Sequence, residues 1–273
     1  MTTLQDLNKH GKYSAKAREP NSKLNFPTPR FYPVAYSETM DLYGFEVALH
    51  SKQPSRTITT EPEDTELERE HASFIDLSTV SMLRNKLRKS SNPKRYRIFV
   101  DVSHHTITHS AGDYIIAMSA LAREILRIVI KVDAEACSAS INEFAHFCNK
   151  CKDREIFVCV DRAEEITEAA MEEIFEKFSP NMIRISGSST LKPPIAQSTV
   201  ERVCAILENA KKHGATVLAH GIDNTLQRRN AQALGVQLIQ GQAVTRHISN
   251  GTATVHTANS TVRSSESRFA ASI

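Results

Sequence analysis

The sequence contains no tryptophan, and aromatic residues make up only 6% of its 273 residues. It also lacks any apolar run close to the roughly 20 residues that a membrane-spanning helix needs. No apolar segment follows Met1, so we expect no secretory signal and predict a cytoplasmic protein without a membrane anchor. The hydrophobic fraction of 40% nevertheless excludes a wholly disordered chain and predicts a sizeable folded core.

The chain also lacks a strong charge of one sign, since 34 Lys and Arg against 31 Asp and Glu give a net charge of +3. Residues 1–26 alone hold five Lys and Arg against two Asp and Glu, which equals the excess of the whole chain. Dedicated nucleic-acid-binding domains usually carry a basic excess on their folded face. We therefore expect no direct binding of nucleic acid.

Cysteine is scarce, and the five cysteines are an odd number, which indicates free thiols in a reducing compartment. Cys148 and Cys151 form a C-x-x-C pair near His146. Zinc needs four ligands, and no second pair with suitable spacing follows. We expect inert thiols, and a redox or metal role for this pair is the weaker alternative.

Two further clusters of titratable residues have an ordinary interpretation. Three histidines, His104, His105 and His109, are expected to be solvated loop residues, with a zinc site as the alternative. The acidic run Glu61–Glu70 is expected to be a solvated loop and helix start, with a partner-docking face as the alternative.

Strand-like and helix-like segments alternate through the middle of the chain. The pattern predicts strands at 30–36, 43–50, 96–102, 127–132, 156–161, 181–185, 216–219 and 237–239. It predicts helices at 68–89, 113–125, 138–150, 166–178, 197–213 and 224–234. Such alternation is typical of an α/β fold, and the number of units favours a TIM-like (β/α) barrel with an antiparallel opening strand. We predict three regions: a flexible basic arm at 1–26, a barrel domain at 27–249 and a Ser/Thr-rich tail at 250–273.

Four segments occur in an order and spacing that resemble the EAL domain, the bacterial phosphodiesterase module for cyclic di-GMP. They are Phe31-Tyr-Pro33-Val, Gly44-Phe-Glu46-Val-Ala-Leu, Ala219-His-Gly221-Ile-Asp-Asn and Gln240-Gly241. The resemblance covers about residues 27–249 and implies a TIM-like barrel of EAL type. It also implies an active site that hydrolyses a phosphodiester with divalent metals, held by oxygen ligands at several strand ends.

The resemblance places three acidic residues at metal-ligand positions of the family, namely Glu46, Asp101 and Asp161. At two other such positions it places cations, Lys131 for a Glu and Arg162 for an Asp. Further exchanges fall at the remaining site positions. There, Arg184 stands for the water-holding Lys, Ser186 for an Asp, His220 for a Glu and His50 for the substrate-binding Arg, whereas Gln240 is retained.

Two added cations oppose metal binding by several kcal/mol at close range. We expect Lys131 and Arg162 to neutralise Glu46 and Asp161 in a pocket without metal or cofactor. A displaced ligand at Asp133, two residues beyond Lys131 and in phase with it on a strand, is the alternative.

These exchanges favour a catalytically inactive EAL-like regulatory protein that acts through binding to a protein partner. A receptor that binds cyclic di-GMP without cleaving it is the first alternative, with phosphate contacts from Lys131, Arg162, Arg184 and Gln240. An active phosphodiesterase with shifted ligands is the second alternative. The resemblance also allows a homodimer.

Overall fold

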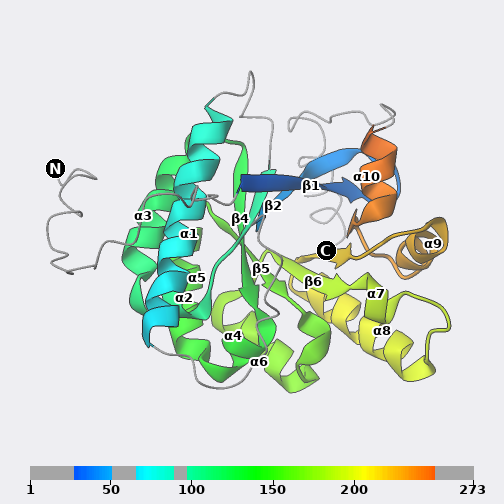
Figure 1. Ribbon diagram of the computed structural model, residues 1–273. Helices are drawn as coiled ribbons and strands as arrows, with labels where there is room; N and C mark the ends of the chain where they lie inside the picture. Colours follow the sequence, from blue (N-terminus) through cyan, green and yellow to red (C-terminus); the bar gives the residue numbers. More distant parts are fainter. Residues whose placement is uncertain (1–27, 51–65, 89–96, 250–273) are drawn as a thin grey trace, which may run out of the picture.

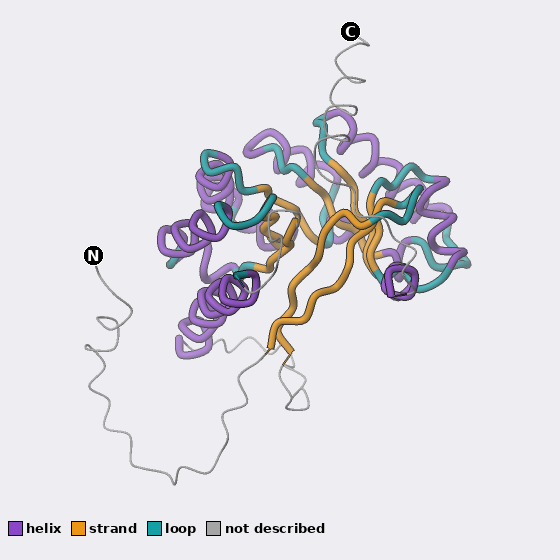
Figure 2. The backbone as a smooth tube through the Cα atoms, turned by 90° about the horizontal axis from the view of Figure 1, so that it is seen from above, coloured by secondary structure: helices purple, strands orange, loops and turns teal. Residues whose placement is uncertain are grey.

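Eight strands close into a barrel in which the order of the strands follows the order of the chain. The computed structural model describes residues 28–50, 66–88 and 97–249. The strands are β1 (Thr28–Tyr36), β2 (Leu42–His50), β3 (Arg97–Asp101), β4 (Arg127–Asp133), β5 (Phe157–Asp161), β6 (Met182–Ser186), β7 (Thr216–His220) and β8 (Leu238–Gln240). Helices surround these strands (Figures 1 and 2), which confirms the predicted TIM-like barrel.

The opening strand runs antiparallel to both of its neighbours, β2 and β8, and all other neighbouring strands are parallel. Its register with β2 extends from Thr28 opposite His50 to Ala35 opposite Leu42. On its other edge, Val34 lies opposite Gln240 of β8. Figure 2 shows β1 and β2 extending together beyond the other strands. The predicted antiparallel opening strand is thus confirmed.

The helices are more numerous than the sequence pattern predicted. They are α1 (Glu66–Leu87), α2 (His104–His109), α3 (Ala111–Ala122), α4 (Ala134–Ala139), α5 (Ile141–Lys152), α6 (Glu168–Phe178), α7 (Gly187–Thr190), α8 (Gln197–Lys212), α9 (Thr225–Ala233) and α10 (Gln242–Ser249), with a 3₁₀ turn at Ala163–Glu165. The short helices α2, α4 and α7 each begin within three residues of a strand end, where the pattern predicted loops or later starts. The closing helix α10 was not predicted.

Side-chain caps explain two of these short helices. Ser103 has extended backbone angles, and its hydroxyl accepts a hydrogen bond from the Thr106 N–H at 3.2 Å. Asp133 does the same for α4, where its carboxylate accepts from the Ala136 N–H at 2.9 Å. Such caps satisfy backbone donors that the first turn of a helix leaves unpaired. Local capping therefore starts both helices directly after their strands.

The interior of the barrel is filled by a layer of apolar side chains. Its members are Val34, Phe99, Val129, Cys159, Met182, Leu218 and Leu238, which are all buried. The larger apolar core lies between the strands and the helices and includes Phe144 and Phe147 of α5. The barrel interior is accordingly a packed core rather than a pore.

All five cysteines are free thiols, as expected. Four of them are buried, and Cys204 is partly buried. Burial raises the pKa of Cys151 to about 12, so the thiolate that redox chemistry needs is scarce at neutral pH.

None of the described helices has the length and apolar character that crossing a membrane requires. The predicted arm at 1–26, the tail at 250–273 and residues 61–65 of the acidic run lie outside the described residues.

Candidate functional site

A layer of charged and polar side chains lies directly above the apolar interior, at the carboxyl ends of the barrel strands. On six of the seven contributing strands the polar residue follows an apolar interior residue by two positions, so both side chains point to the same face, and on β2 Glu46 follows Gly44. The pairs are Phe99 and Asp101, Val129 and Lys131, Cys159 and Asp161, Met182 and Arg184, Leu218 and His220, and Leu238 and Gln240. We call Glu46, Asp101, Lys131, Asp161, Arg184, His220 and Gln240 the charge layer.

Lys131 is the centre of the charge layer, and its side chain is only 4% exposed. Its ammonium donates to Glu46 of β2, lies 2.8 Å from Oδ1 of Asp101 and lies 4.0 Å from Oδ2 of Asp161. Burial disfavours the charge of Lys131, but these carboxylates outweigh it and raise the lysine pKa. Lys131 is therefore a permanent buried cation at neutral pH.

Arg184 is the second cation of the charge layer. Its Nη1 donates to Oδ2 of Asp161 at 2.6 Å, and its Nη2 lies 3.3 Å from Oε2 of Glu46. The same Nη2 donates to Oε1 of Gln240 at 3.2 Å. Burial tends to raise the pKa of Glu46, but the charges of Lys131 and Arg184 prevail and lower it. Three carboxylates against two cations leave one net negative charge in this layer.

The prediction that Arg162 neutralises Asp161 is wrong. The Arg162 backbone is left-handed, with φ 57°, and the guanidinium donates through Nε to Asp133 at 2.8 Å. It also pairs with Glu165 at 3.1 Å, and the side chain is 47% exposed. Arg162 follows Asp161 by one residue, so it is out of phase with the interior face of β5. The cation that neutralises Asp161 is Arg184.

The alternative of a displaced metal ligand at Asp133 is also wrong. One carboxylate oxygen of Asp133 accepts from the Ala136 N–H, and the other accepts from Arg162. The side chain therefore serves as a helix cap and as the partner of an arginine.

His220 is a partly buried member of the charge layer, opposite Ser186 in the register of β6 and β7. Burial and the charge of Arg184 lower its pKa to about 4, so its imidazole is neutral at pH 7. Ser186 is turned to its neighbours, because its N–H donates to Glu164 at 2.8 Å and its hydroxyl lies 2.9 Å from that of Ser188.

His50 is the last residue of β2, four positions beyond Glu46. Its backbone lies opposite Thr28 of β1. Its side chain lies outside what the structure describes.

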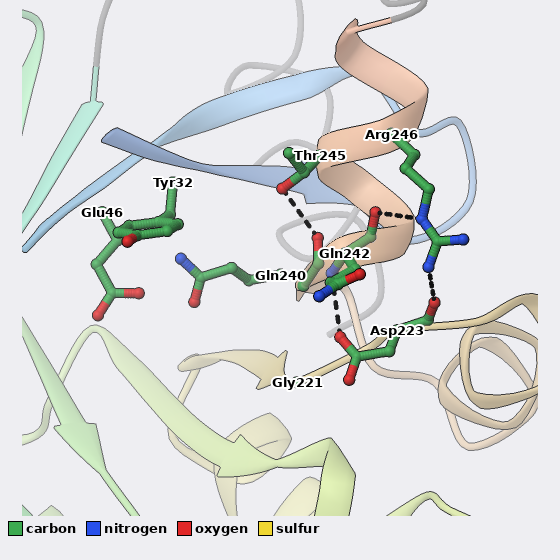
Figure 3. Close-up of a pocket in the computed structure, with 9 residues that line it drawn as sticks. Tyr32, Glu46, Gly221, Asp223, Gln240, Gln242, Thr245 and Arg246 are labelled. Atoms are coloured by element: carbon green, nitrogen blue, oxygen red, sulfur yellow. Dashed lines mark hydrogen bonds between the residues drawn. The ribbon is translucent and has the colours of Figure 1, made fainter. Parts of the chain in front are cut away.

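A cavity of about 450 Å³ opens beside the charge layer, between β1, β8 and the start of α10. It is lined by Tyr32, Glu46, Gly221, Asp223, Gln240, Gly241, Gln242, Thr245 and Arg246. Figure 3 shows Tyr32, Glu46 and Gln240 on one side, with Asp223, Gln242 and Arg246 on the other. Arg246 donates to the backbone carbonyl of Asp223 at 2.7 Å and to that of Gln242 at 3.3 Å.

The sequence did not identify Tyr32 or the α10 residues Gln242, Thr245 and Arg246 as lining residues of this cavity. Tyr32 lies opposite Glu46 in the register of β1 and β2, so the antiparallel pairing brings both to the mouth. The Phe31-Tyr-Pro33 segment was a usable signal for Tyr32. Arg246 had no such signal, because α10 was not predicted.

The three histidines on α2 do not form a metal site. The rings of His105 and His109 stack with centroids 4.2 Å apart, whereas His104 packs against Phe144 at 5.5 Å. Nδ1 of His109 shares a hydrogen bond with the Thr108 hydroxyl.

Comparison with known protein families identifies the chain, because the model of the EAL domain matches residues 22–247. The chain belongs to the EAL domain family. This is a family of cyclic di-GMP signalling, whose members include phosphodiesterases for that dinucleotide. No curated protein gives a significant sequence match to this EAL domain.

Solved structures of low sequence identity share the fold of this EAL domain. The PaMucR phosphodiesterase, in complex with c-di-GMP, has a TM-score of 0.64 and 13% identity over 80% of this chain and 90% of that chain. Klebsiella pneumoniae BlrP1, in complex with calcium and c-di-GMP, has a TM-score of 0.63 and 14% identity over 83% of this chain. The EAL enzyme Bd1971, bound to cAMP and cyclic di-GMP, has a TM-score of 0.66 and 15% identity over 81% of this chain. This chain spans 56% of the BlrP1 chain and 62% of the Bd1971 chain.

The divalent metals that the family resemblance implies do not fit the charge layer of this EAL domain. The Lys131 ammonium lies among Glu46, Asp101 and Asp161, the three acidic positions that the sequence retains. Within 28–50, 66–88 and 97–249, no three His, Cys, Asp or Glu side chains are grouped so that they could hold a metal ion. A metal ion at the same place would face the ammonium at close range, which costs several kcal/mol. The three carboxylates already share a cation that the chain itself supplies.

Proposed function

We propose that this EAL domain does not hydrolyse cyclic di-GMP and acts as a regulatory protein that binds another protein in the bacterial cytoplasm. The observation that carries this proposal is the position of the Lys131 ammonium among Glu46, Asp101 and Asp161. Metal-assisted hydrolysis needs carboxylates that are free to hold a metal ion, and the metal ion then lowers the pKa of a bound water molecule. In this barrel those carboxylates pair with Lys131 and Arg184.

Arg184 supports the same proposal from the other side of the layer. The resemblance places it at the position of the lysine that holds the attacking water in active EAL domains. Here its guanidinium is 9% exposed and donates to Asp161, Glu46 and Gln240. Its terminal nitrogens Nη1 and Nη2 are thus engaged with acceptors inside the barrel, which limits their capacity to position a water molecule.

Incubation of the purified chain with cyclic di-GMP and Mg²⁺ or Mn²⁺, followed by chromatography, tests the proposal. We expect no linear dinucleotide. The Glu46→Gln variant is the matched control, because trace turnover that persists in it comes from a contaminant. Turnover in the original chain that disappears in this variant would overturn the proposal.

A second candidate function, a cyclic di-GMP receptor without hydrolysis, is favoured by the cavity beside Glu46. This cavity offers a tyrosine ring from Tyr32 and a buried amide from Gln240. PaMucR, BlrP1 and Bd1971 were each solved with cyclic di-GMP. The net negative charge of the charge layer opposes a dianionic ligand, which is why we place this function second.

Calorimetric titration with cyclic di-GMP in the absence of metal separates the two functions. Saturable heat that Tyr32→Ala and Gln240→Ala remove supports the receptor. Absence of heat supports the protein-binding function, for which affinity capture and reconstitution with the purified partner provide the direct test.

A further inference from the structure

A second cavity lies on the outside of the barrel, between the first turns of α6 and α8. Its volume is about 380 Å³, and we call it the α6–α8 groove. Three buried apolar side chains, Ile166, Met171 and Ile206, form its floor. Below the groove, an ion pair of Glu172 with Lys212 at 3.4 Å joins the two helices. The groove is therefore an apolar cleft that is closed at its lower end and lies at the starts of two neighbouring helices.

The polar residues of the α6–α8 groove favour an occupant with positive charge and N–H groups. Glu168 and Glu201 are exposed lining residues, and the one lining cation, Arg202, donates to the backbone carbonyl of Ile166. Oδ1 of Asn209, another lining residue, is buried and has no hydrogen-bond partner within the described ranges. A buried acceptor without a donor costs free energy, which an N–H group from an occupant would recover.

The groove lies at the same end of the barrel as the start of β1. Helix α6 follows β5 through the 3₁₀ turn, and α8 follows β6 through α7, so both helices begin at the carboxyl ends of their strands. Thr28, the first residue of β1, lies opposite His50, which is at the carboxyl end of β2. The 27 residues before Thr28 span up to about 90 Å when extended, against a diameter of roughly 30 Å for a small domain. They are long enough to reach the groove.

Charge distinguishes this segment from the other parts of the chain that the structure does not describe. Residues 1–27 hold five Lys and Arg against two Asp and Glu, an excess of three positive charges. Residues 51–65 have an excess of one negative charge, and residues 250–273 have an excess of one positive charge. Residues 89–96 are basic but lead into the amino end of β3, which is the opposite end of the barrel. The segment that best complements the glutamates of the groove is therefore 1–27.

We propose that residues 1–27 of this chain bind in the α6–α8 groove. Leu4 and Leu7 supply apolar side chains for its floor. Lys9 and Lys12 supply positive charge for its two glutamates. Attachment to the same chain gives an effective concentration in the millimolar range, so modest contacts are enough to occupy the groove. The groove lies outside the charge layer, and this inference is independent of the function proposed for that layer.

Methyl NMR of the full chain with labelled methionines tests this docking, because the Met171 side chain lines the groove. Its resonance can be assigned with Met171→Leu. We expect the triple variant Lys9→Gln, Lys12→Gln, Lys16→Gln to move the Met171 methyl resonance by more than its linewidth. The resonance of Met118, which is buried on α3, is expected to stay in place.

The matched control for this experiment is the double variant Arg263→Gln, Arg268→Gln, which removes the positive charges of residues 250–273. We expect it to leave the Met171 resonance unchanged. An unchanged Met171 resonance in the triple lysine variant would overturn the docking. A shift in the control variant would assign the groove to residues 250–273 instead, and a shift that disappears on dilution would assign it to a second copy of the chain.

Limited trypsin digestion tests the groove side of the same contact, with cleavage after Lys9 and Lys12 followed by mass spectrometry. We expect Glu168→Gln with Glu201→Gln to accelerate this cleavage about fivefold, the effect of losing two exposed charge pairs. The control is Glu173→Gln with Glu176→Gln, since these glutamates are exposed on α6 and do not line the groove. Equal cleavage rates in the two double variants would contradict the proposal, provided that circular dichroism shows both to be folded.

Discussion

Lys131 on β4 donates to Glu46, which lies two strands away on β2. Glu46 is the glutamate that the family resemblance assigns to metal binding, and in this chain its partners are Lys131 and Arg184. The negative charge of the family pocket is thus retained in part, whereas the positive charge comes from side chains of the barrel itself.

Replacing Lys131 with methionine removes the central cation while it keeps most of the side-chain volume. Glu46, Asp101 and Asp161 then share only Arg184, and loss of one partner of a buried ion pair costs about 3–5 kcal/mol. We expect Lys131→Met to lower the free energy of unfolding by about that amount in urea denaturation at pH 7. Lys212→Met is the control, since Lys212 forms an exposed pair with Glu172 at 3.4 Å, and such pairs contribute about 0–1 kcal/mol. Equal losses in the two variants would contradict the central role of Lys131.

The lowered pKa of His220 predicts that the free energy of unfolding depends on pH in the mildly acidic range. Its folded pKa is lowered to about 4, whereas an unfolded histidine has a pKa of about 6.5. Between these values the unfolded chain binds a proton that the folded chain does not, so stability falls as the pH is lowered from about 6.5 to about 4. The full effect is about 3 kcal/mol at most. We expect His220→Gln to reduce this slope in unfolding experiments across the range. The exposed His146 provides the control variant His146→Gln, and an unchanged slope in His220→Gln would show that other groups cause it.

Replacing Lys131 with glutamate restores an acidic residue at a position where the family carries one. The variant places four carboxylates around the same point, so we expect it to be less stable than the original chain without metal. Addition of Mn²⁺ at about ten times its dissociation constant stabilises the variant by about 1.4 kcal/mol, a rise in Tm of roughly 3–6 °C. The original chain and a Lys212→Glu control show no such rise in differential scanning fluorimetry. A comparable rise in the original chain would mean that Lys131 does not exclude the metal.

Arg184 and Arg162 are expected to differ sharply in their contribution to stability. Arg184 is buried between Asp161 and Glu46, so Arg184→Gln should cost about 3–5 kcal/mol. The Arg162 side chain is 47% exposed and pairs with Asp133 and Glu165, so Arg162→Gln should lower the free energy of unfolding by no more than about 1 kcal/mol. Double-mutant cycles with Asp161→Asn measure the coupling directly. A larger coupling of Asp161 to Arg162 than to Arg184 would contradict the arrangement described above.

Much of the fold could be predicted from the sequence, because alternating strands and helices have distinct periods. The antiparallel pair, the parallel strands and the longer helices all lie close to their predicted ranges. The short helices α2 and α4 escaped prediction because they depend on single capping side chains, Ser103 and Asp133, rather than on an apolar stripe. The closing helix α10 is short as well, and its pattern is confined to eight residues.

The charge layer could be predicted in composition but not in pairing. Lys131, Asp161 and Arg184 were all identified as site residues by the resemblance to the EAL family. The error over Arg162 arose because the resemblance places it at a metal-ligand position of the family, next to Asp161. The two-residue period of a strand argues otherwise, since Arg184 is in phase with the interior Met182 and Arg162 is out of phase with Cys159. The left-handed backbone at Arg162, which directs its side chain toward Asp133, has no signal in the sequence.

Lys131 is covalently part of the chain, so the folded barrel cannot release this cation to the solution. A metal ion exchanges with solution, so its occupancy varies with the supply of metal and with chelators. The ammonium of Lys131 has a fixed stoichiometry of one for each folded chain and no dissociation constant. Under the proposed function, the charge at this mouth therefore stays the same whether magnesium is scarce or abundant.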